Sequence, residues 1–323
     1  MACERRKRMK GIRGSTEFEK QFIDVFEQLC RRHHSWKVWQ DFVNMSACAI
    51  ANAVDKRPAV WKLREDSYME TIKSYSKDEL NLISELLSIT TLALDENPAQ
   101  DFLGKFYMQF DFGSGWHGQF FTPWHVAELM AKLQLGDEAK DQIASEDYIS
   151  VCDSCCGAGC MLMAFAKVCK DDMDINYQRS VLFVGQDIDE VVAKMCYIQI
   201  SLLGCPGYVV VGNSLSDPVC GTAIEPNYKK PENIWFTPLY FTDVWTLRRI
   251  RSWNAEVRKP EEMMEKEKES PKSEESSKST TPEIVRSVPT VHKPPQMPVM
   301  KKSEGKKPFS WKEFFTVKGK GKR

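Results

Sequence analysis

The sequence predicts an α/β protein: a parallel sheet with helices on both faces, preceded by a helical N-terminal region. Three observations support this fold class. Short apolar runs alternate with helix-length segments between residues 104 and 250, which is typical of βαβ units. The middle runs are almost entirely apolar, as strands buried on both faces should be. Ahead of them, apolar residues recur at three- and four-residue steps, the period of amphipathic helices.

The N-terminal part of the chain, residues 15–103, is predicted to be helical. One helical face of residues 18–32 is formed by Phe18, Phe22, Val25, Phe26 and Leu29. Residues 39–54 and 76–94 show a similar pattern, and Ser76 with Glu79 three residues later predicts a capping box. These apolar stripes are typical of helices that face a core, and we assign them no chemistry.

The middle of the chain, residues 104–254, is predicted to hold the sheet. We expect strands at 148–153, 180–189, 207–215 and 233–241, with helices at 160–170 and 190–204 between them. Strands separated by helix-length segments favour parallel pairing, because each crossover returns the chain to the same edge of the sheet.

The two ends of the chain are basic, although 45 basic and 45 acidic residues cancel overall. Residues 1–14 form a basic tail, and residues 301–323 carry nine basic and two acidic residues. Such ends suit a polyanion such as nucleic acid, and they equally suit solvated tails. Residues 255–307 are charged, rich in Ser and Pro and poor in aromatics, which predicts a disordered linker. The basic aromatic segment 308–323 is expected either to dock on a partner or to pack back on the domain.

No membrane or secretory signal is apparent in the sequence. The basic start is not followed by an apolar run, and no segment approaches the roughly 18 apolar residues of a membrane span. The eleven cysteines are odd in number and scattered, which favours reduced thiols. We therefore expect a cytoplasmic protein.

Four cysteines lie close together at 152, 155, 156 and 160, where a strand is predicted to meet a helix. A zinc site would need a second pair of ligands, which the sequence does not offer nearby. The spacing of Cys152 and Cys155 also fits a redox dithiol. The third interpretation rests on Gly157 and Gly159, which allow a ligand to approach the main chain closely.

The interpretation of the glycine loop as a ligand site also gives a role to an acidic residue further along the chain. Gly157 and Gly159 are expected at the carboxyl edge of the sheet, where open α/β proteins bind ligands. Asp187 ends the next predicted strand, and a carboxylate there can accept hydrogen bonds from both hydroxyls of a ribose. This pattern predicts a nucleoside-containing ligand, although the third glycine of a dinucleotide motif is absent.

Four motifs give the sequence a resemblance to a known family. Residues 153–159, DSCCGAG, resemble the DPxCGxG loop of the N6-adenine DNA methyltransferases, which bind S-adenosylmethionine. Residues 118–133 resemble the FTP segment that precedes this loop in type I restriction-modification methylation subunits. Residues 185–189, GQDID, and 212–215, GNSL, resemble the second and third motifs of that family. The resemblance covers roughly residues 104–245 and implies a class I methyltransferase, Rossmann-like fold.

The resemblance also implies roles for individual residues. The methionine and adenosine side of the cofactor would be wrapped by Phe121, Thr122 and Pro123. The loop beneath its amino-acid end would be lined by Asp153, Cys155, Gly157 and Gly159. Asp187 would bind the ribose hydroxyls, Ile188 would pack on the adenine, and Asn213 would accept a bond from the adenine amino group. The family commonly has Asp at the position of Asn213.

The catalytic motif of the family is absent. Family members hold the target amine with NPPY or NPPF, whose aromatic ring stacks on a flipped-out base. At the expected place, after the fourth predicted strand, stands TPLY, which gives Thr237, Pro238 and Tyr240 as candidate catalytic residues. EPNY at 225–228 is expected to be an ordinary loop. Losing one positioned acceptor can cost about 10²–10³ in rate, so we expect a weak, altered or lost activity.

The sequence therefore predicts an S-adenosylmethionine-dependent, adenine-specific DNA methyltransferase-like protein of restriction-modification type. Two alternatives remain open: an inactive cofactor-binding, regulatory or DNA-binding subunit, and a methyltransferase that acts on RNA or protein. After Tyr240 only a short helical stretch precedes the predicted linker, which leaves no room there for a target-recognition domain. The DNA sequence would be read by a partner such as a specificity subunit, by the helical N-terminal region, or not at all. Arg248, Arg249 and Arg251 could contact phosphates or cap a helix end.

Overall fold

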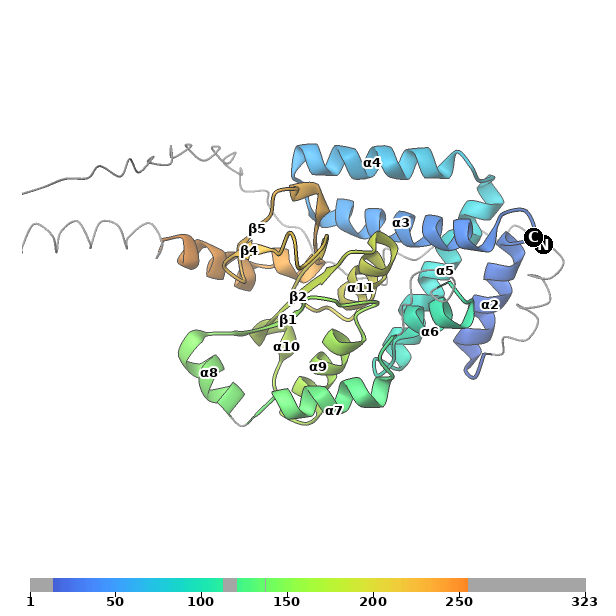
Figure 1. Cartoon of the computed structure of the whole chain (residues 1–323). Helices are drawn as coiled ribbons and strands as arrows, with labels where there is room; N and C mark the ends of the chain where they lie inside the picture. Colours follow the sequence, from blue (N-terminus) through green and yellow to red (C-terminus); the bar gives the residue numbers. More distant parts are fainter. Residues whose placement is uncertain (1–13, 113–120, 137, 255–323) are drawn as a thin grey trace, which may run out of the picture. The chain divides into compact units, whose positions relative to one another are not determined.

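The computed structural model describes residues 14–112, 121–136 and 138–254. The predictions for the basic tail, for residues 255–307 and for the aromatic segment 308–323 fall outside or almost wholly outside these residues. The described residues all belong to one compact unit (Figure 1).

Among the described residues, five helices lie between Glu17 and Gln109, a range that contains most of the predicted helical region. They are α2 (Glu17–Leu29), α3 (Ser35–Val54), α4 (Pro58–Ile72), α5 (Lys77–Glu96) and α6 (Phe102–Gln109). The predicted capping box at the start of α5 is present: the Ser76 hydroxyl accepts from the Glu79 N–H, and the Glu79 carboxylate accepts from the Ser76 N–H. Aromatic rings fill the space between these helices, and Phe22 stacks on Phe106 with ring centroids 4.6 Å apart.

The main sheet has four strands in the order β1-β2-β3-β6. Its strands are β1 (Ile149–Asp153), β2 (Val181–Asp187), β3 (Gly207–Val211) and β6 (Ile234–Phe236). A separate two-stranded sheet pairs β4 (Cys220–Gly221) with β5 (Pro226–Asn227). Among the described residues, β1 pairs with β2 alone, so the strand that leads into the glycine loop lies at an edge of this sheet.

The direction of β6 corrects the prediction of a wholly parallel sheet. β1, β2 and β3 are parallel, but β6 runs antiparallel to β3, with Phe236 beside Tyr208 and Ile234 beside Val210. The reason lies in the connection: residues 212–233 contain no α-helix, only β4, β5 and the short η1 (Pro231–Asn233). Without a crossover helix to carry it back, the chain returns in the opposite direction.

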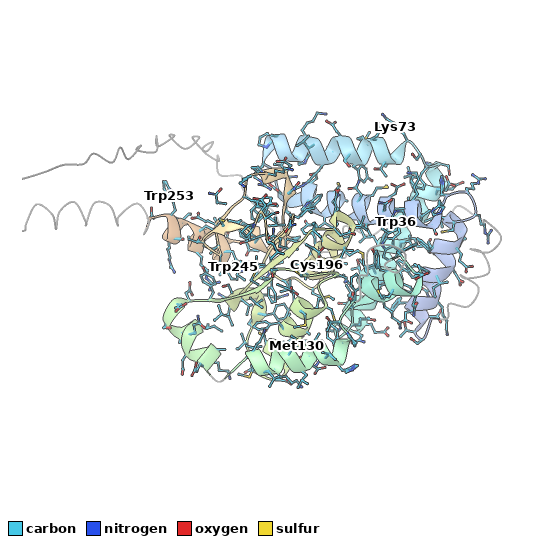
Figure 2. All side chains as sticks on the ribbon, in the orientation of Figure 1. Trp36, Lys73, Met130, Cys196, Trp245 and Trp253 are labelled. Atoms are coloured by element: carbon cyan, nitrogen blue, oxygen red, sulfur yellow. The ribbon has the colours of Figure 1, made fainter. Side chains whose placement is uncertain are left out.

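Helices cover both faces of the sheet, as predicted. The helices between the strands are α9 (Cys160–Asp171), α10 (Tyr177–Ser180) and α11 (Glu190–Leu202), and α7 (Trp124–Gln134) and α8 (Glu138–Glu146) precede β1. The face of the sheet that carries Leu182 and Tyr208 packs against η2 (Pro238–Phe241) and a helix at 243–254. Trp245 of that helix is fully buried and Trp253 is exposed (Figure 2).

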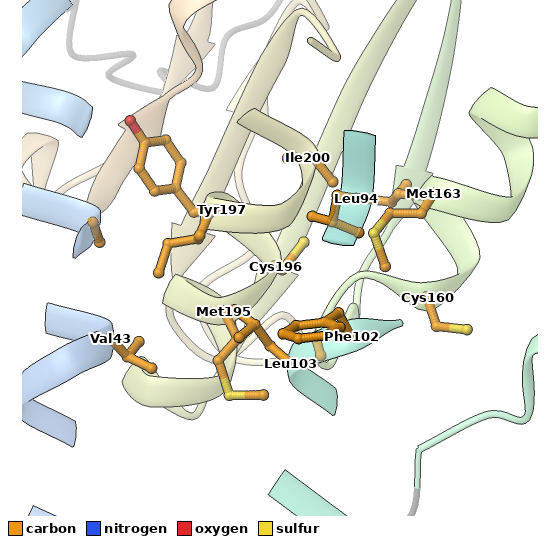
Figure 3. Close-up of a cluster of buried hydrophobic side chains, with 14 of the residues drawn as sticks. Val43, Leu94, Phe102, Leu103, Cys160, Met163, Met195, Cys196, Tyr197 and Ile200 are labelled. Atoms are coloured by element: carbon orange, nitrogen blue, oxygen red, sulfur yellow. The ribbon is translucent and has the colours of Figure 1, made fainter. Parts of the chain in front are cut away.

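The hydrophobic core runs without a break from the N-terminal helices to the sheet. α11 is buried at every position from Val192 to Ser201, because the sheet covers one side and α3, α5 and α6 cover the other. Figure 3 shows Val43 of α3, Phe102 of α6 and Cys196 of α11 in this shared layer. The predicted boundary between residues 103 and 104 therefore marks a change in sequence pattern, and the hydrophobic core continues across it.

A buried ion-pair network also joins the two parts. Asp55 is fully buried and pairs with Arg57 at 2.7 Å and with Arg64 at 2.8 Å. Arg64 in turn donates to the carbonyl oxygen of Ile234 on β6 at 2.8 Å. Burial alone would raise the pKa of Asp55, but the hydrogen bonds and charges of the two arginines outweigh burial and lower it.

Candidate cofactor site

The glycine loop connects β1 to α9 at the carboxyl edge of the sheet. Gly157 and Gly159 have φ of +55° and +95°, in the left-handed region that glycine adopts without strain. A Cβ on Gly159 would lie 2.8 Å from Sγ of Cys196, so the loop packs too closely on α11 for a larger residue. The Cys156 N–H donates to the Gln186 carbonyl oxygen at 3.0 Å, which fastens the loop to β2.

Asp187 and the glycine loop lie together, as the sequence predicted. The carboxylate of Asp187 accepts from the Gly157 N–H at 2.9 Å and from the Asp189 N–H at 3.0 Å. The acid at the end of β2 therefore holds the turn that follows β1. Ile188 is 68% exposed beside it, with an apolar side chain free to cover a ligand.

A small pocket, partly open to solvent, lies over this loop. The predicted site residues that line it are Phe121, Thr122, Asp153, Cys155 and Gly157. The Phe121 ring lies against Gly157, where an added Cβ would be 3.5 Å from the ring. The ring also stacks on Tyr107 of α6, with centroids 5.3 Å apart. Pro123 stands at the start of α7 as its N-cap residue.

Carboxylates give the pocket a negative character. Burial raises the pKa of Asp153, and the nearby charge of Asp187 raises it further. Sequence reasoning missed a third carboxylate, Asp101, which precedes α6 and also lines the pocket. Burial raises the pKa of Asp101 as well. An acidic pocket of this kind favours a ligand with positive charge.

Asn213 lies at the same sheet edge but uses its side chain locally. Its Oδ1 accepts from the Leu215 N–H at 2.9 Å and from the Ser216 N–H at 3.2 Å, which stabilises the turn after β3. The preceding Gly212 N–H donates to the Asp187 carbonyl oxygen at 2.8 Å. The turn is therefore held against the end of β2, while the Asn213 carbonyl oxygen that was expected to meet adenine is occupied.

The TPLY segment lies at the opposite edge of the sheet, which corrects the expectation that it stands where the family's catalytic motif would. Because β6 is antiparallel to β3, its carboxyl end lies beside Gly207, at the amino end of β3. The Thr237 N–H donates to the Gly207 carbonyl oxygen at 2.9 Å. The glycine loop follows β1 at the other end of the strands. The two ends of β3, Gly207 and Val211, are themselves roughly 13 Å apart.

The side chains of TPLY are committed to the fold. Thr237 is fully buried, and its hydroxyl donates to the Cys205 carbonyl oxygen at 2.7 Å and accepts from the Gly207 N–H at 2.9 Å. Pro238 begins η2. The Tyr240 hydroxyl donates to the Ile224 carbonyl oxygen at 2.7 Å, and its ring stacks on Phe236 with centroids 4.4 Å apart. The three candidate catalytic residues therefore do not face the pocket.

The arginines of the last described helix are largely engaged with protein groups. Arg248 pairs with Asp147 at 2.9 Å and stacks over the Trp245 ring. Arg249 donates to the Tyr240 carbonyl oxygen and lies over the Tyr240 ring. Of the three arginines, Arg251 alone is mostly exposed. The other expected loop, EPNY, partly forms β5.

The cysteines near the loop divide by burial. Cys152 and Cys155 are exposed, whereas Cys156 and Cys160 are buried. Burial raises the pKa of the Cys160 thiol to about 12, which keeps it protonated and unreactive at neutral pH. In the described segments, no three His, Cys, Asp or Glu side chains are arranged to hold a metal ion.

Comparison with known proteins gives a family match. The sequence model of the family described as N-6 DNA Methylase matches residues 99–274, which is more than half of the chain. The chain is also 29% identical over 158 residues to the type I restriction enzyme MpnII methylase subunit of Mycoplasma pneumoniae. That match covers 43% of this chain and 27% of the relative, so the chain spans about a quarter of the relative's length.

No solved structure matches the chain significantly. None of the helices in the described segments combines the length and the apolar character that a membrane span requires. The family match contains the glycine loop, Asp187, the pocket and the sheet that carries them, and the chain belongs to the N-6 DNA methylase family.

Proposed function

We propose that the pocket over the glycine loop binds S-adenosylmethionine. The supporting observation is the convergence of Phe121, Gly157 and Asp187 at the carboxyl edge of the sheet. Phe121 offers an aromatic face, and Gly157 leaves room for a ligand that a side chain would fill. Asp187 and Ile188 follow the next strand, where the ribose and adenine would be held. When bound, this cofactor supplies an electrophilic methyl group on a positively charged sulfur.

The charge of the pocket fits this cofactor. Asp101 and Asp153 line the pocket, and Asp187 binds the loop beneath it. Their negative field favours the sulfonium and ammonium groups and disfavours a polyphosphate. The pocket therefore suits a cationic nucleoside better than a nucleotide di- or triphosphate. Asn213 remains a candidate contact to the adenine amino group only if its turn opens.

We further propose that the chain is the cofactor-binding subunit of an adenine-specific DNA methylase. Family membership supports the chemistry and DNA as the substrate, in the cytoplasm where bacterial or phage DNA is found. The position of TPLY favours a subunit over a self-sufficient enzyme, because Thr237 and Tyr240 are buried at the far edge of the sheet. The groups that hold the target base would then come from a partner, such as a specificity subunit, or from residues beyond the described ones.

The free edge of the described sheet is compatible with such a partner. β1 pairs only with β2 among the described residues, and its backbone leads directly into the glycine loop. A strand added beside β1 would place its own end next to the pocket. This geometry would allow a second polypeptide segment to deliver base-holding groups to the cofactor.

The experiment has two parts, binding and transfer. Calorimetry would measure S-adenosylmethionine binding to the wild type, to Asp187→Ala and to Asp95→Ala, a control at an exposed helical position. We expect Asp187→Ala to weaken binding at least about tenfold and the control to leave it unchanged. Incubation with labelled cofactor and unmethylated DNA then distinguishes the two roles.

Each outcome has a definite meaning. Binding without label transfer supports the subunit role, and transfer that appears only when a partner is added supports it further. Transfer by this chain alone would show a complete enzyme and refute that role. A wild type that binds no cofactor at millimolar concentration would refute both proposals.

A further inference from the structure

Asp101 occupies the part of the pocket next to the start of α9. It precedes α6 and, as the N-cap residue of that helix, accepts from the Gly104 N–H at 2.8 Å through Oδ1. It lines the pocket together with Ala158, Cys160 and Met161. The carboxylate therefore lies near the last part of the glycine loop, beyond Gly157, to which Asp187 is bonded.

Gln199 of α11 fixes the position of this carboxylate. Its side chain is fully buried, and Nε2 donates both to Oδ1 of Asp101 and to the Ala158 carbonyl oxygen, each at 2.8 Å. Its Oε1 accepts from the Leu103 N–H at 2.9 Å. The NH₂ group and the carbonyl oxygen of the Gln199 amide thus connect α6, the glycine loop and Asp101.

These contacts leave Oδ2 of Asp101, which packs against Gly104, without a hydrogen bond from a described residue. Both hydrogen bonds to Asp101 reach Oδ1, and within the described residues none reaches Oδ2. Among the described residues, no cationic side chain forms an ion pair with this carboxylate, and the nearby Lys105 of α6 pairs with Glu19 instead. Burying a carboxylate without a cation is costly, and burial raises the pKa of Asp101 accordingly.

We propose that Asp101 is a specificity residue that binds the α-ammonium group at the amino-acid end of the cofactor. This inference rests on the proposed cofactor function. The surroundings match both charges of that end. α9 begins at Cys160 without a side-chain cap, so its first N–H groups can receive a carboxylate, while Asp101 receives the ammonium.

The test uses a pair of ligands that differ in this group alone. Calorimetry would compare S-adenosylhomocysteine with its analogue that lacks the α-amino group, on the wild type and on Asp101→Asn. Asn is as good an N-cap residue as Asp and keeps an oxygen for Gly104 and Gln199, so the fold should survive. Thermal unfolding of each variant would verify this, and Asp95→Asn provides a matched control at an exposed position.

We expect loss of the amino group to weaken binding to the wild type about 10- to 100-fold. In Asp101→Asn the same loss should change affinity less than about threefold, because the partner charge is already gone. An equal penalty in both proteins would overturn the inference, as would equal affinity of the wild type for both ligands. Failure of the wild type to bind either ligand would instead refute the proposed function. If Asp101→Asn fails to fold, equal wild-type affinities would still overturn the inference.

Discussion

Replacing Tyr240 by Phe tests whether the TPLY segment holds the fold together or holds a target base. The Tyr240 hydroxyl is buried and donates to the Ile224 carbonyl oxygen at 2.7 Å. The substitution removes this donor and leaves the carbonyl buried without it, while the stack on Phe236 is kept. If the ring instead faced solvent in order to stack on a base, removal of the hydroxyl would leave the stability unchanged.

The expected cost follows from the lost hydrogen bond. Leaving a buried carbonyl unsatisfied lowers the free energy of unfolding by about 1–2 kcal/mol. For a unit of this size that corresponds to a fall in the midpoint of thermal unfolding of about 2–8 °C. Because the glycine loop lies at the other edge of the sheet, S-adenosylmethionine affinity should remain within about twofold of the wild type.

Thermal and urea unfolding would measure the first effect and calorimetry the second. Tyr68→Phe, at a partly exposed position on α4, gives the cost of removing a phenol hydroxyl outside the core. Our reasoning would be refuted if Tyr240→Phe unfolded at the wild-type temperature. A loss of cofactor affinity without loss of stability would refute it equally, because Tyr240 would then belong to the pocket.

Three further predictions concern other parts of the molecule. Gly159→Ala should lower the free energy of unfolding by about 2–5 kcal/mol, because φ is positive there and the added Cβ would lie 2.8 Å from the Cys196 sulfur. Gly157→Ala should cost less stability but impair cofactor binding, and urea titration and calorimetry separate the two effects. Asp55→Asn should destabilise by about 3–5 kcal/mol at pH 7. Folding lowers the pKa of Asp55, so the stability that its carboxylate contributes is present above the unfolded pKa of about 4 and is lost as pH falls through the folded pKa. The stability difference between Asp55→Asn and the wild type should therefore shrink below about pH 4. A difference that stayed constant in acid would contradict the ion-pair account. Finally, S-adenosylmethionine should slow alkylation of Cys155, which lines the pocket, but not of Cys220, which is exposed on β4, as mass spectrometry of the labelled thiols would reveal.

Much of the fold was accessible from the sequence because its signals are local. The period of apolar residues gave α2, α3 and α5, and the capping box gave the start of α5. The apolar runs gave β1, β2 and β3. The glycine loop and Asp187 were paired correctly, because residues that follow neighbouring parallel strands meet at one edge of the sheet.

The errors arose where the signal is not local. Three apolar residues, Ile234–Phe236, indicate a strand but carry no information on its direction. The available clue was the absence of a helical pattern over residues 212–233, which removes the crossover that a parallel strand requires. Asp101 was missed for a related reason: before α6 it reads as an N-cap residue, and only tertiary packing brings it to a loop more than fifty residues later in the chain.

The three hydrogen bonds of Gln199 link the stability of α6 to occupancy at the sheet edge. A ligand that binds only the folded pocket stabilises every segment on which the pocket depends. The Gln199 side chain is hydrogen-bonded to both the Leu103 N–H and the Ala158 carbonyl oxygen, so it connects α6 directly to the glycine loop. Amide hydrogens of α6 should therefore exchange more slowly when the pocket is filled, and the N-terminal helices act as part of the receptor rather than as a separate appendage.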